Sequence, residues 1–557
     1  MMMARHATPV FLACWVGMVC ASSSWGQINP SVVIAKSGDN VPGLTGIQFS
    51  SATPQAFTAP YVNASGTVGF FGGLTGTGVT ANVNDSAIFV GSTTSAPQVV
   101  VRNGDATPGI AGATFNGMNS VGAISDTGLV VFRATVTGGG TTTANNSGYW
   151  GWTSGSGLSL IARGGDTAPG TGGAVWNNFT STPFVLPDGR IAFSATLVQG
   201  GAVTSTNDSG FWIGSPGNLQ TLIREGDALT GITGVNFSTP NFTGVNASGQ
   251  FTFRSAITGT GVTASNNNVI VTGSSSGNFT VMMRTGETPS GIPSGQTVNA
   301  FGSSAAVLAN GQTYFAASLT GTGVTASNNV TVWVGDSQVN RQMVFRTGDQ
   351  VPGLPTGVVF AGVGIPKAYG NTVVYSSTVA GTGVTTSNDN YIGKWTSGTG
   401  IQVVAREGDV APGTGGATFG NFVTASLGDG STPVVGTDGT IAFRAPLLGT
   451  GVTAGVNDAA IFLNRNGVNL LLARRGDVIS LGEGQGTGTI ADLTLTSSIA
   501  GMTVGSATLA SDGSIAYLAT LTDGRSVILF SPVPEPTTII MIAALGILFV
   551  GYYFHRV

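Results

Sequence analysis

The stretch Arg102-Asn-Gly-Asp105-Ala-Thr-Pro-Gly109 is one copy of a phrase, Arg-x-Gly-Asp followed by x-x-Pro-Gly, that recurs along the chain. Its acidic residue returns at intervals of 60 to 68 residues, at Asp39, Asp105, Asp166, Asp227, Glu287, Asp349, Asp409 and Asp477. The basic residue three positions earlier is Lys36, Arg102, Arg163, Arg224, Arg284, Arg346, Arg406 or Arg474. Self-similarity at a fixed period is typical of repeat architectures, so this phrase decides the fold.

A second phrase lies midway between copies of the first and reads Asp-Gly-x-Ile-Ala-Phe-x-Ala-x-Leu, as in 188–197 and 438–447. Its apolar residues alternate with small or polar ones, which predicts a strand, and the Asp-Gly before it predicts a tight turn. The strand runs into a loop of the type Thr-Gly-Thr-Gly-Val-Thr-x-x-Asn-Asp, and further short apolar runs lie on either side. No stretch has a helical period, so each unit of about 60 residues contains about four strands.

The two ends of the repeat region complement each other. Residues 32–39 supply only the last strand of a unit, whereas the part after Gly476 supplies the earlier strands, at 515–518 and 527–530, and then stops. Four-stranded units in tandem are typical of a β-propeller, and a ring closed by these two fragments hides the strand edges that a linear array exposes. The sequence therefore predicts an all-β, eight-bladed propeller; a linear solenoid or a string of small sandwiches is the alternative.

Composition excludes most enzyme chemistry. The only histidines are His6 and His555 and the only cysteines are Cys14 and Cys20, so residues 27–531 contain neither type. Nucleophilic catalysis that uses histidine, and histidine- or thiolate-ligated metal, need side chains that this region lacks. A net charge of −4 gives no footprint for nucleic acid. We expect no catalytic residue and no cofactor.

The repeated acids have two interpretations. We favour a structural turn, in which the Arg and Asp of one phrase pair and the Asp accepts backbone amides; a ring of acidic ligands is the alternative. The Thr-Gly-rich loop has oxygen ligands for calcium, although a long polar hairpin is favoured. A carbohydrate-active enzyme would need two carboxylates at one centre. The acids outside the repeat pattern show no linking motif: Asp336, Asp429, Glu483, Asp492 and Asp523.

Both ends of the chain predict export. Residues 1–26 have a weakly basic start, an apolar core and small residues before Gln27, as a signal peptide does. At the other end, Pro534-Glu535-Pro536 precedes an apolar run, 537–554, whose length suits a transmembrane helix, and Arg556 follows it. A plain membrane anchor does not need the two prolines.

This three-part tail, residues 532–557, resembles the PEP-CTERM sorting signal of Gram-negative bacteria. The resemblance implies a membrane helix before processing, an exosortase-type membrane protease as partner, and delivery to the cell surface or the extracellular matrix. The repeats of residues 27–531 also resemble tandem-repeat ectodomains that accompany this signal, and that likeness implies no activity.

These observations favour an exported, non-enzymatic surface or matrix protein that is structural or binds extracellular polysaccharide at many points. A calcium- or sugar-dependent binding module is the first alternative, and a carboxylate-based enzyme is the second.

Overall fold

The computed structural model describes residues 31–51, 57–177, 179, 182–422, 433–436, 438–495, 509–510 and 512–532. Throughout these ranges the regular structure consists of strands, from β1 to β37. None of these residues belongs to a helix that is long and apolar enough to cross a membrane. The expected signal peptide, the sorting motif and the helix at 537–554 lie outside the described residues.

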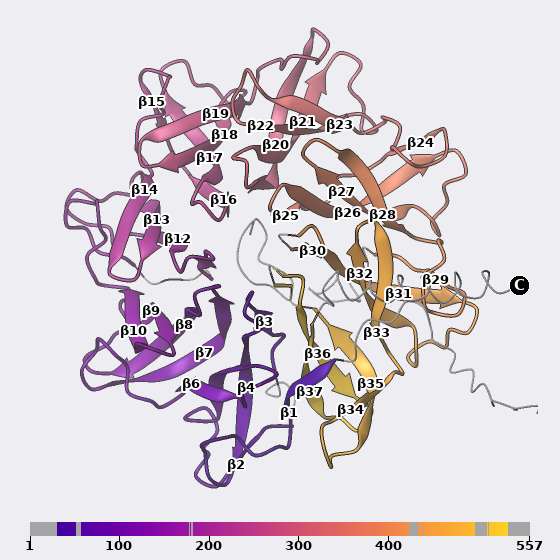
Figure 1. The fold of residues 1–557 in the computed structure, drawn as a ribbon. Coiled ribbons are helices and arrows are strands. Elements are labelled where there is room, and N and C mark those ends of the chain that lie inside the picture. Colours follow the sequence, from indigo (N-terminus) through magenta and orange to yellow (C-terminus); the bar gives the residue numbers. More distant parts are fainter. Residues whose placement is uncertain are drawn as a thin grey trace, which may run out of the picture.

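The strands form eight sheets arranged as the blades of a ring (Figure 1). Blades 1 and 2 contain β2 (Ile47–Phe49), β3 (Tyr61–Val62), β4 (Val68–Gly76), β5 (Ser86–Gly91) and β6 (Gln98–Arg102), then β7 (Ala113–Ile124), β8 (Val130–Gly138), β9 (Ser147–Thr153) and β10 (Gly157–Arg163). Blades 3 and 4 contain β11 (Phe184–Val185), β12 (Ile191–Thr196), β13 (Ser209–Ser215) and β14 (Asn218–Arg224), then β15 (Val235–Phe237), β16 (Asn241–Val245), β17 (Phe251–Gly259), β18 (Asn268–Ser275) and β19 (Asn278–Arg284).

The second half of the ring repeats this order. Blades 5 and 6 contain β20 (Gln296–Val307), β21 (Thr313–Gly321), β22 (Val330–Gly335) and β23 (Gln342–Arg346), then β24 (Val358–Phe360), β25 (Lys367–Tyr369), β26 (Thr372–Gly381), β27 (Asn390–Thr396) and β28 (Gly400–Arg406). Blades 7 and 8 contain β29 (Ala417–Phe419), β30 (Val434–Val435), β31 (Ile441–Gly449), β32 (Ala459–Arg465) and β33 (Val468–Arg474), then β34 (Val478–Ser480), β35 (Thr487–Thr494), β36 (Ile515–Leu521), β37 (Ser526–Ser531) and β1 (Val32–Lys36).

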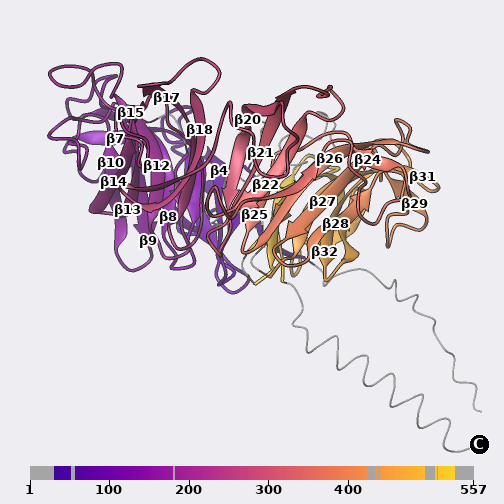
Figure 2. The ribbon, with the colours of Figure 1, turned by 90° about the horizontal axis from the view of Figure 1, so that it is seen from above.

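The first strand of a unit is divided in several blades. An outer piece (β2, β15, β24 or β29) and an inner piece (β3, β16, β25 or β30) pair with the same second strand, and Figure 1 shows the outer pieces at the periphery of the ring. In blades 2 and 5 the two pieces are one continuous, bulged strand, β7 or β20. The side view in Figure 2 shows that the ring is one layer of blades deep.

The ring closes as the sequence predicts. β1 pairs antiparallel with β37, with Val32 opposite Phe530 and Lys36 opposite Val527, and so becomes the last strand of blade 8. The eight-bladed, all-β prediction is therefore confirmed.

The hydrophobic core lies between blades. Each of eight buried clusters draws side chains from two neighbouring blades. One of them joins Ile34 and Phe530 of blade 8 to Phe49, Phe70 and Phe89 of blade 1. Because apolar burial is the main driving force of folding, each blade depends on both of its neighbours.

Polar turns link neighbouring blades nearer the centre. Between blades 1 and 2, the Asn63 side chain donates to the Ser125 carbonyl (2.9 Å). Between blades 4 and 5, the Asn246 side chain donates to the Leu308 carbonyl (2.8 Å). These hydrogen bonds add polar links between neighbouring blades to the apolar contacts of the core.

Candidate functional site

The acid of the repeated phrase caps its own turn. In four copies an Asp oxygen accepts the backbone N–H of the arginine three residues earlier, at 2.7 to 2.8 Å: Asp105, Asp227, Asp349 and Asp477. A direct ion pair between the two side chains is present in two copies, Lys36–Asp39 (3.0 Å) and Arg163–Asp166 (3.1 Å). The carboxylate thus acts mainly on the backbone, as Asp does in tight turns.

This turn is also bonded to the next blade. Gly104 N–H donates to the Phe115 carbonyl (2.8 Å), and Phe115 N–H donates to the Asp105 carbonyl (3.0 Å). The same two bonds join Gly226 and Asp227 to Phe237, and Gly348 and Asp349 to Phe360. The phrase therefore fixes the passage from one blade to the next.

The arginine of the phrase has a second role that the sequence did not reveal. Its Nε donates to the backbone carbonyl of an asparagine in the long Thr-Gly-rich loop of its own blade. The pairs are Arg102–Asn84, Arg224–Asn207, Arg284–Asn266, Arg346–Asn328, Arg406–Asn388 and Arg474–Asn457, at 2.5 to 2.9 Å. Six of the seven loops are therefore held by the repeated arginine, whereas Arg163 of blade 2 pairs with Asp166 instead.

We call the long Thr-Gly-rich loops between the second and third strands of blades 1 to 7 the rim loops. In each, the side-chain oxygen of an asparagine accepts a threonine backbone N–H at 2.7 to 2.8 Å, at Asn84, Asn145, Asn207, Asn266, Asn328, Asn388 and Asn457. The same asparagine usually donates back to a glycine or alanine carbonyl, as Asn328 does to Gly323 (3.1 Å). The rim loops therefore share one asparagine-to-backbone hydrogen bond, which spans three residues in blades 2 to 6 and four residues in blades 1 and 7.

Exposed hydroxyls project from this fixed backbone. Four rim loops carry a bonded hydroxyl pair at 2.9 to 3.0 Å: Thr204–Thr206, Thr263–Ser265, Thr325–Ser327 and Thr385–Ser387. At the base of a loop, Gly321 has φ +118° and an added Cβ there would lie 2.0 Å from the Gly295 carbonyl, so only glycine fits. The result is a series of loops that present exposed hydroxyl groups around the ring.

The variable second position of the phrase differs between blades. In blade 3, Glu225 accepts a hydrogen bond from the Ser209 hydroxyl (3.0 Å). Burial raises the pKa of Glu225, the Ser209 hydroxyl lowers it, and the nearby Asp208 carboxyl raises it again. Glu407 of blade 6 has the same arrangement with Asn390 and Asp389, and its pKa is raised for the same reasons.

Blade 7 has an arginine at this position. Arg475 pairs with Asp458 (2.5 Å) and with Asp492 (2.8 Å), which also pairs with Arg444. Burial acts to raise the pKa of Asp458, but the Gly455 amide and Arg475 outweigh it and lower that pKa. The variable position of the phrase therefore belongs to a pair of acids in blades 3 and 6 and to an Arg–Asp ion pair in blade 7.

We expect the double variant Glu225→Gln, Glu407→Gln to be more stable than the native chain at pH 7. The raised pKa values of Glu225 and Glu407 mean that the folded chain binds a proton on each of these carboxyls more tightly than the unfolded chain does. The stability they contribute is therefore present below about pH 4.5 and is lost as the pH rises through the folded pKa values. Melting temperatures measured from pH 4 to 8 should differ at pH 7 and converge at the acidic end.

The matched control is Arg475→Gln, which should lower the melting temperature at pH 7 because it leaves Asp458 without its cation and Asp492 with Arg444 alone. Equal melting temperatures for the glutamine double variant and the native chain at pH 7 would contradict the prediction.

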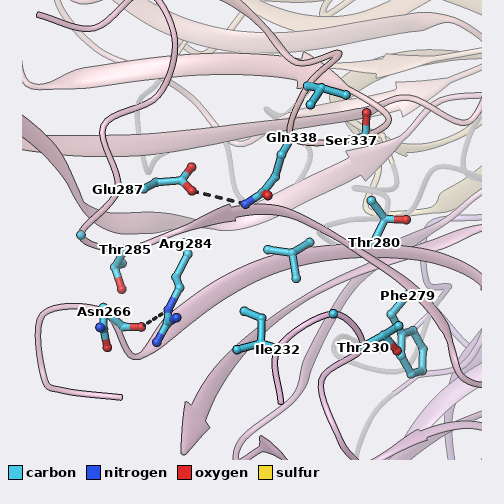
Figure 3. A pocket seen from close by; sticks show the side chains of 14 residues that line it. Thr230, Ile232, Asn266, Phe279, Thr280, Arg284, Thr285, Glu287, Ser337 and Gln338 are labelled. Carbon is cyan, nitrogen blue, oxygen red and sulfur yellow. Dashed lines mark hydrogen bonds between the residues drawn. The ribbon is translucent and has the colours of Figure 1, made fainter. Parts of the chain in front are cut away.

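A cleft of about 730 Å³ lies between blades 4 and 5 (Figure 3). Its floor is β19, with Phe279, Val281 and Arg284, and its walls are the loop at Thr230–Ile232 and the hairpin at Ser337–Val339. Glu287, the one glutamate among the repeated acids, reaches across to Arg341 (2.7 Å) and accepts a hydrogen bond from Gln338 (3.3 Å). Burial raises the pKa of Glu287, and Arg341 opposes that effect.

The acids outside the repeat pattern that belong to the described residues do not converge on one centre. Asp492 belongs to the ion pairs with Arg444 and Arg475, Asp523 pairs with Arg525 (2.6 Å), and Asp336 accepts a hydrogen bond from Ser337 (3.0 Å). Asp429 lies outside the described residues. Among the residues that the structure describes, no group of three or more His, Cys, Asp or Glu side chains is placed to hold a metal ion.

Comparison with solved structures gives only distant likenesses. A β-1,3-galactosidase of glycoside hydrolase family 43, bound to galactodeoxynojirimycin, is 11% identical, with 57% of this chain and 99% of that chain covered and a TM-score of 0.24. A levansucrase mutant from Bacillus subtilis is 12% identical, with 52% and 87% covered and a TM-score of 0.24. Such low scores carry no argument about chemistry. None of the curated proteins matches the chain.

Two family models match. The PEP-CTERM protein-sorting motif matches residues 532–557, which confirms the resemblance of the tail. A family of unknown function, DUF7453, matches residues 24–202 and 176–540 and thus nearly the whole propeller. The chain is therefore a member of the DUF7453 family that ends in a PEP-CTERM sorting motif, as an exported protein does.

Proposed function

We propose that this protein is a non-enzymatic component of the cell surface or extracellular matrix that holds extracellular polysaccharide through its rim loops. The observation that carries the proposal is that seven exposed loops around one ring share the same asparagine-to-threonine backbone hydrogen bond. The sorting motif supports it, because such a tail implies export and handling by an exosortase-type protease.

The chemistry of the rim loops suits a neutral, hydroxylated polymer. Threonine and serine hydroxyls both donate and accept hydrogen bonds, as sugar hydroxyls do. Each exposed contact of this kind is weak because it replaces a contact with water. Seven equivalent loops on one frame give a long polymer several points of attachment, and linked weak contacts add to a higher overall affinity.

The test removes hydroxyls and keeps the loop backbone. The variant carries Thr263→Val, Ser265→Ala, Thr325→Val, Ser327→Ala, Thr385→Val and Ser387→Ala, in blades 4 to 6. The asparagine-to-backbone hydrogen bonds stay, so the melting temperature should be unchanged. We expect binding of the full chain, in detergent, to immobilised exopolysaccharide from the producing cells to weaken at least about tenfold.

The matched control removes a similar exposed hydroxyl pair elsewhere, Ser92 and Thr94 in the hairpin of blade 1 (3.2 Å apart), by Ser92→Ala and Thr94→Val. This control should bind as the native chain does. Unchanged binding by the six-residue variant would refute the role of the rim loops, and release of reducing sugar from the polymer by the native chain would refute the non-enzymatic assignment.

A further inference from the structure

Blade 4 departs from the repeat at the loop that enters it. In five other blades a proline precedes the glycine of this loop: Pro42, Pro108, Pro169, Pro352 and Pro412. In blade 4 the residue is Thr230, before Gly231. In blades 2 and 3 the carbonyl of that proline accepts a hydrogen bond from a tryptophan of the third strand, Trp150 (3.4 Å) or Trp212 (3.1 Å).

Tryptophan occupies this position of the third strand in blades 2, 3 and 5, and blade 4 is among the blades that lack it. Trp212 lies opposite Phe193 in blade 3, and the register of β17 and β18 places Val271 opposite Phe253 at the same point. Blade 4 thus has a small side chain where blades 2 and 3 have an indole that ties the loop down. The loop at Thr230–Ile232 forms one side of the cleft between blades 4 and 5, together with β19.

Blade 5 supplies a second departure on the opposite wall. The hairpin between β22 and β23 carries Val339, which is 89% exposed, and ends at Arg341. The Arg341 side chain is only 8% exposed; it lies over the Trp333 ring, 5.9 Å from its centre, and pairs with Glu287. Glu287 is itself the third departure, since the other copies of the phrase have aspartate, which is one methylene shorter. The wall is therefore held in place before any ligand arrives.

All three departures line one cleft, which is where a repeat protein would place a function that needs a single copy. The volume of about 730 Å³ lies in the usual range of small-molecule sites. Ile232 and Val281 give the cleft apolar surface, and Thr280, Thr285, Ser337 and Gln338 give hydroxyl and amide groups. Glu287 is neutralised by Arg341, and Arg284 is held by the Asn266 carbonyl (2.6 Å).

From this lining we infer that the cleft between blades 4 and 5 binds a short, neutral oligosaccharide. A sugar ring presents C–H groups to an apolar surface and hydroxyls to its rim, which matches the mixed lining, and no unpaired carboxylate is available for a cationic ligand. The choice of a saccharide rests on the proposed function, whereas the cleft is separate from the rim loops and occurs once rather than seven times.

The test titrates the full chain, in detergent, with cellotetraose, maltotetraose and chitotetraose by calorimetry. We expect at least one of them to bind with one-to-one stoichiometry and with an affinity that stays constant from about 50 to about 500 mM NaCl, because a neutral ligand releases no screened charge. Val339→Glu and Gln338→Ala should each weaken that binding at least about tenfold. Val468→Glu, at an exposed hairpin valine of blade 7, should leave it unchanged.

The inference is overturned if none of the three tetrasaccharides binds, if Val339→Glu and Gln338→Ala bind as the native chain does, or if extended peptides compete for the site more strongly than sugars. The two proposals fail separately. Absence of tetrasaccharide binding together with polymer binding that the rim-loop variant weakens refutes the cleft alone. One-to-one tetrasaccharide binding together with unchanged polymer binding by the rim-loop variant refutes the rim loops alone.

Discussion

A chain that lacks residues 27–39 is expected to lose the closed ring. The deletion removes β1, so the free edge of β37 is exposed and the cluster between blades 8 and 1 loses Ile34 and Ala35. Removing one large buried aliphatic side chain typically destabilises a protein by about 2 to 5 kcal/mol, and here the ladder hydrogen bonds are lost as well. We expect a loss of at least about 5 kcal/mol, measured by chemical denaturation and by sensitivity to protease.

Two single variants test whether the stability depends on the buried packing of β1 and not simply on the length of the chain. Ile34 is 7% exposed and Val32 is 42% exposed on the same strand. Ile34→Asp should reproduce much of the destabilisation because it buries a charge, whereas Val32→Asp should have little effect. Equal stability of the native chain, the truncated chain and Ile34→Asp would show that the ring does not depend on β1.

The geometry of the closing pair explains why the effect should be large. The third and fourth strands of the other blades share a register shift, for example between Phe211 and Trp212 and between Ile270 and Val271. β1 and β37 have the same kind of shift between Val33 and Ala35. The closing strand is thus a full fourth strand that belongs to the sheet, although 490 or more residues separate it from its partner in the sequence.

The fold could be predicted because its determinants are local and repeated. Alternation at Ile191, Phe193, Ala195 and Leu197 marks a strand with one face in each of two interblade cores, and Phe193 and Leu197 are indeed buried there. The complementary ends predicted the closure because each fragment matched part of a unit that was present elsewhere in full. The division of the first strand into inner and outer pieces depends on the bend of each blade, which has no such local pattern.

The contacts of the rim loops could not be predicted in the same way. The repeated arginine donates to a backbone carbonyl 17 or 18 residues earlier, and a carbonyl has no residue type to mark it in the sequence. Both parts of the expected turn are observed, the ion pair in two copies and the backbone cap in four, but the bond from the arginine to the loop was not predicted. The cleft was missed for another reason, since it arises from residues that are absent from blade 4 and not from a motif.

The sorting motif gives the other large effect. The double variant Pro534→Ala, Pro536→Ala should leave the tail uncut, so that the protein stays in the membrane. Proline has a fixed φ and no N–H, so the sequence predicts that Pro534 and Pro536 disfavour helix just before the apolar run. Alanine at both positions should favour continuation of the expected helix of 537–554 toward Glu535.

The measurement is the mass and the location of the protein in the producing cells. The native chain should be found at the surface or in the medium without its tail, and the double variant should remain in the membrane fraction at full mass. Pro532→Ala is the matched control, because it removes a nearby proline and leaves Pro-Glu-Pro intact, and it should be processed normally. Normal release of the double variant would mean that the tail is a plain membrane anchor, because an anchor needs the apolar run alone, whereas a protease must also recognise the residues before it.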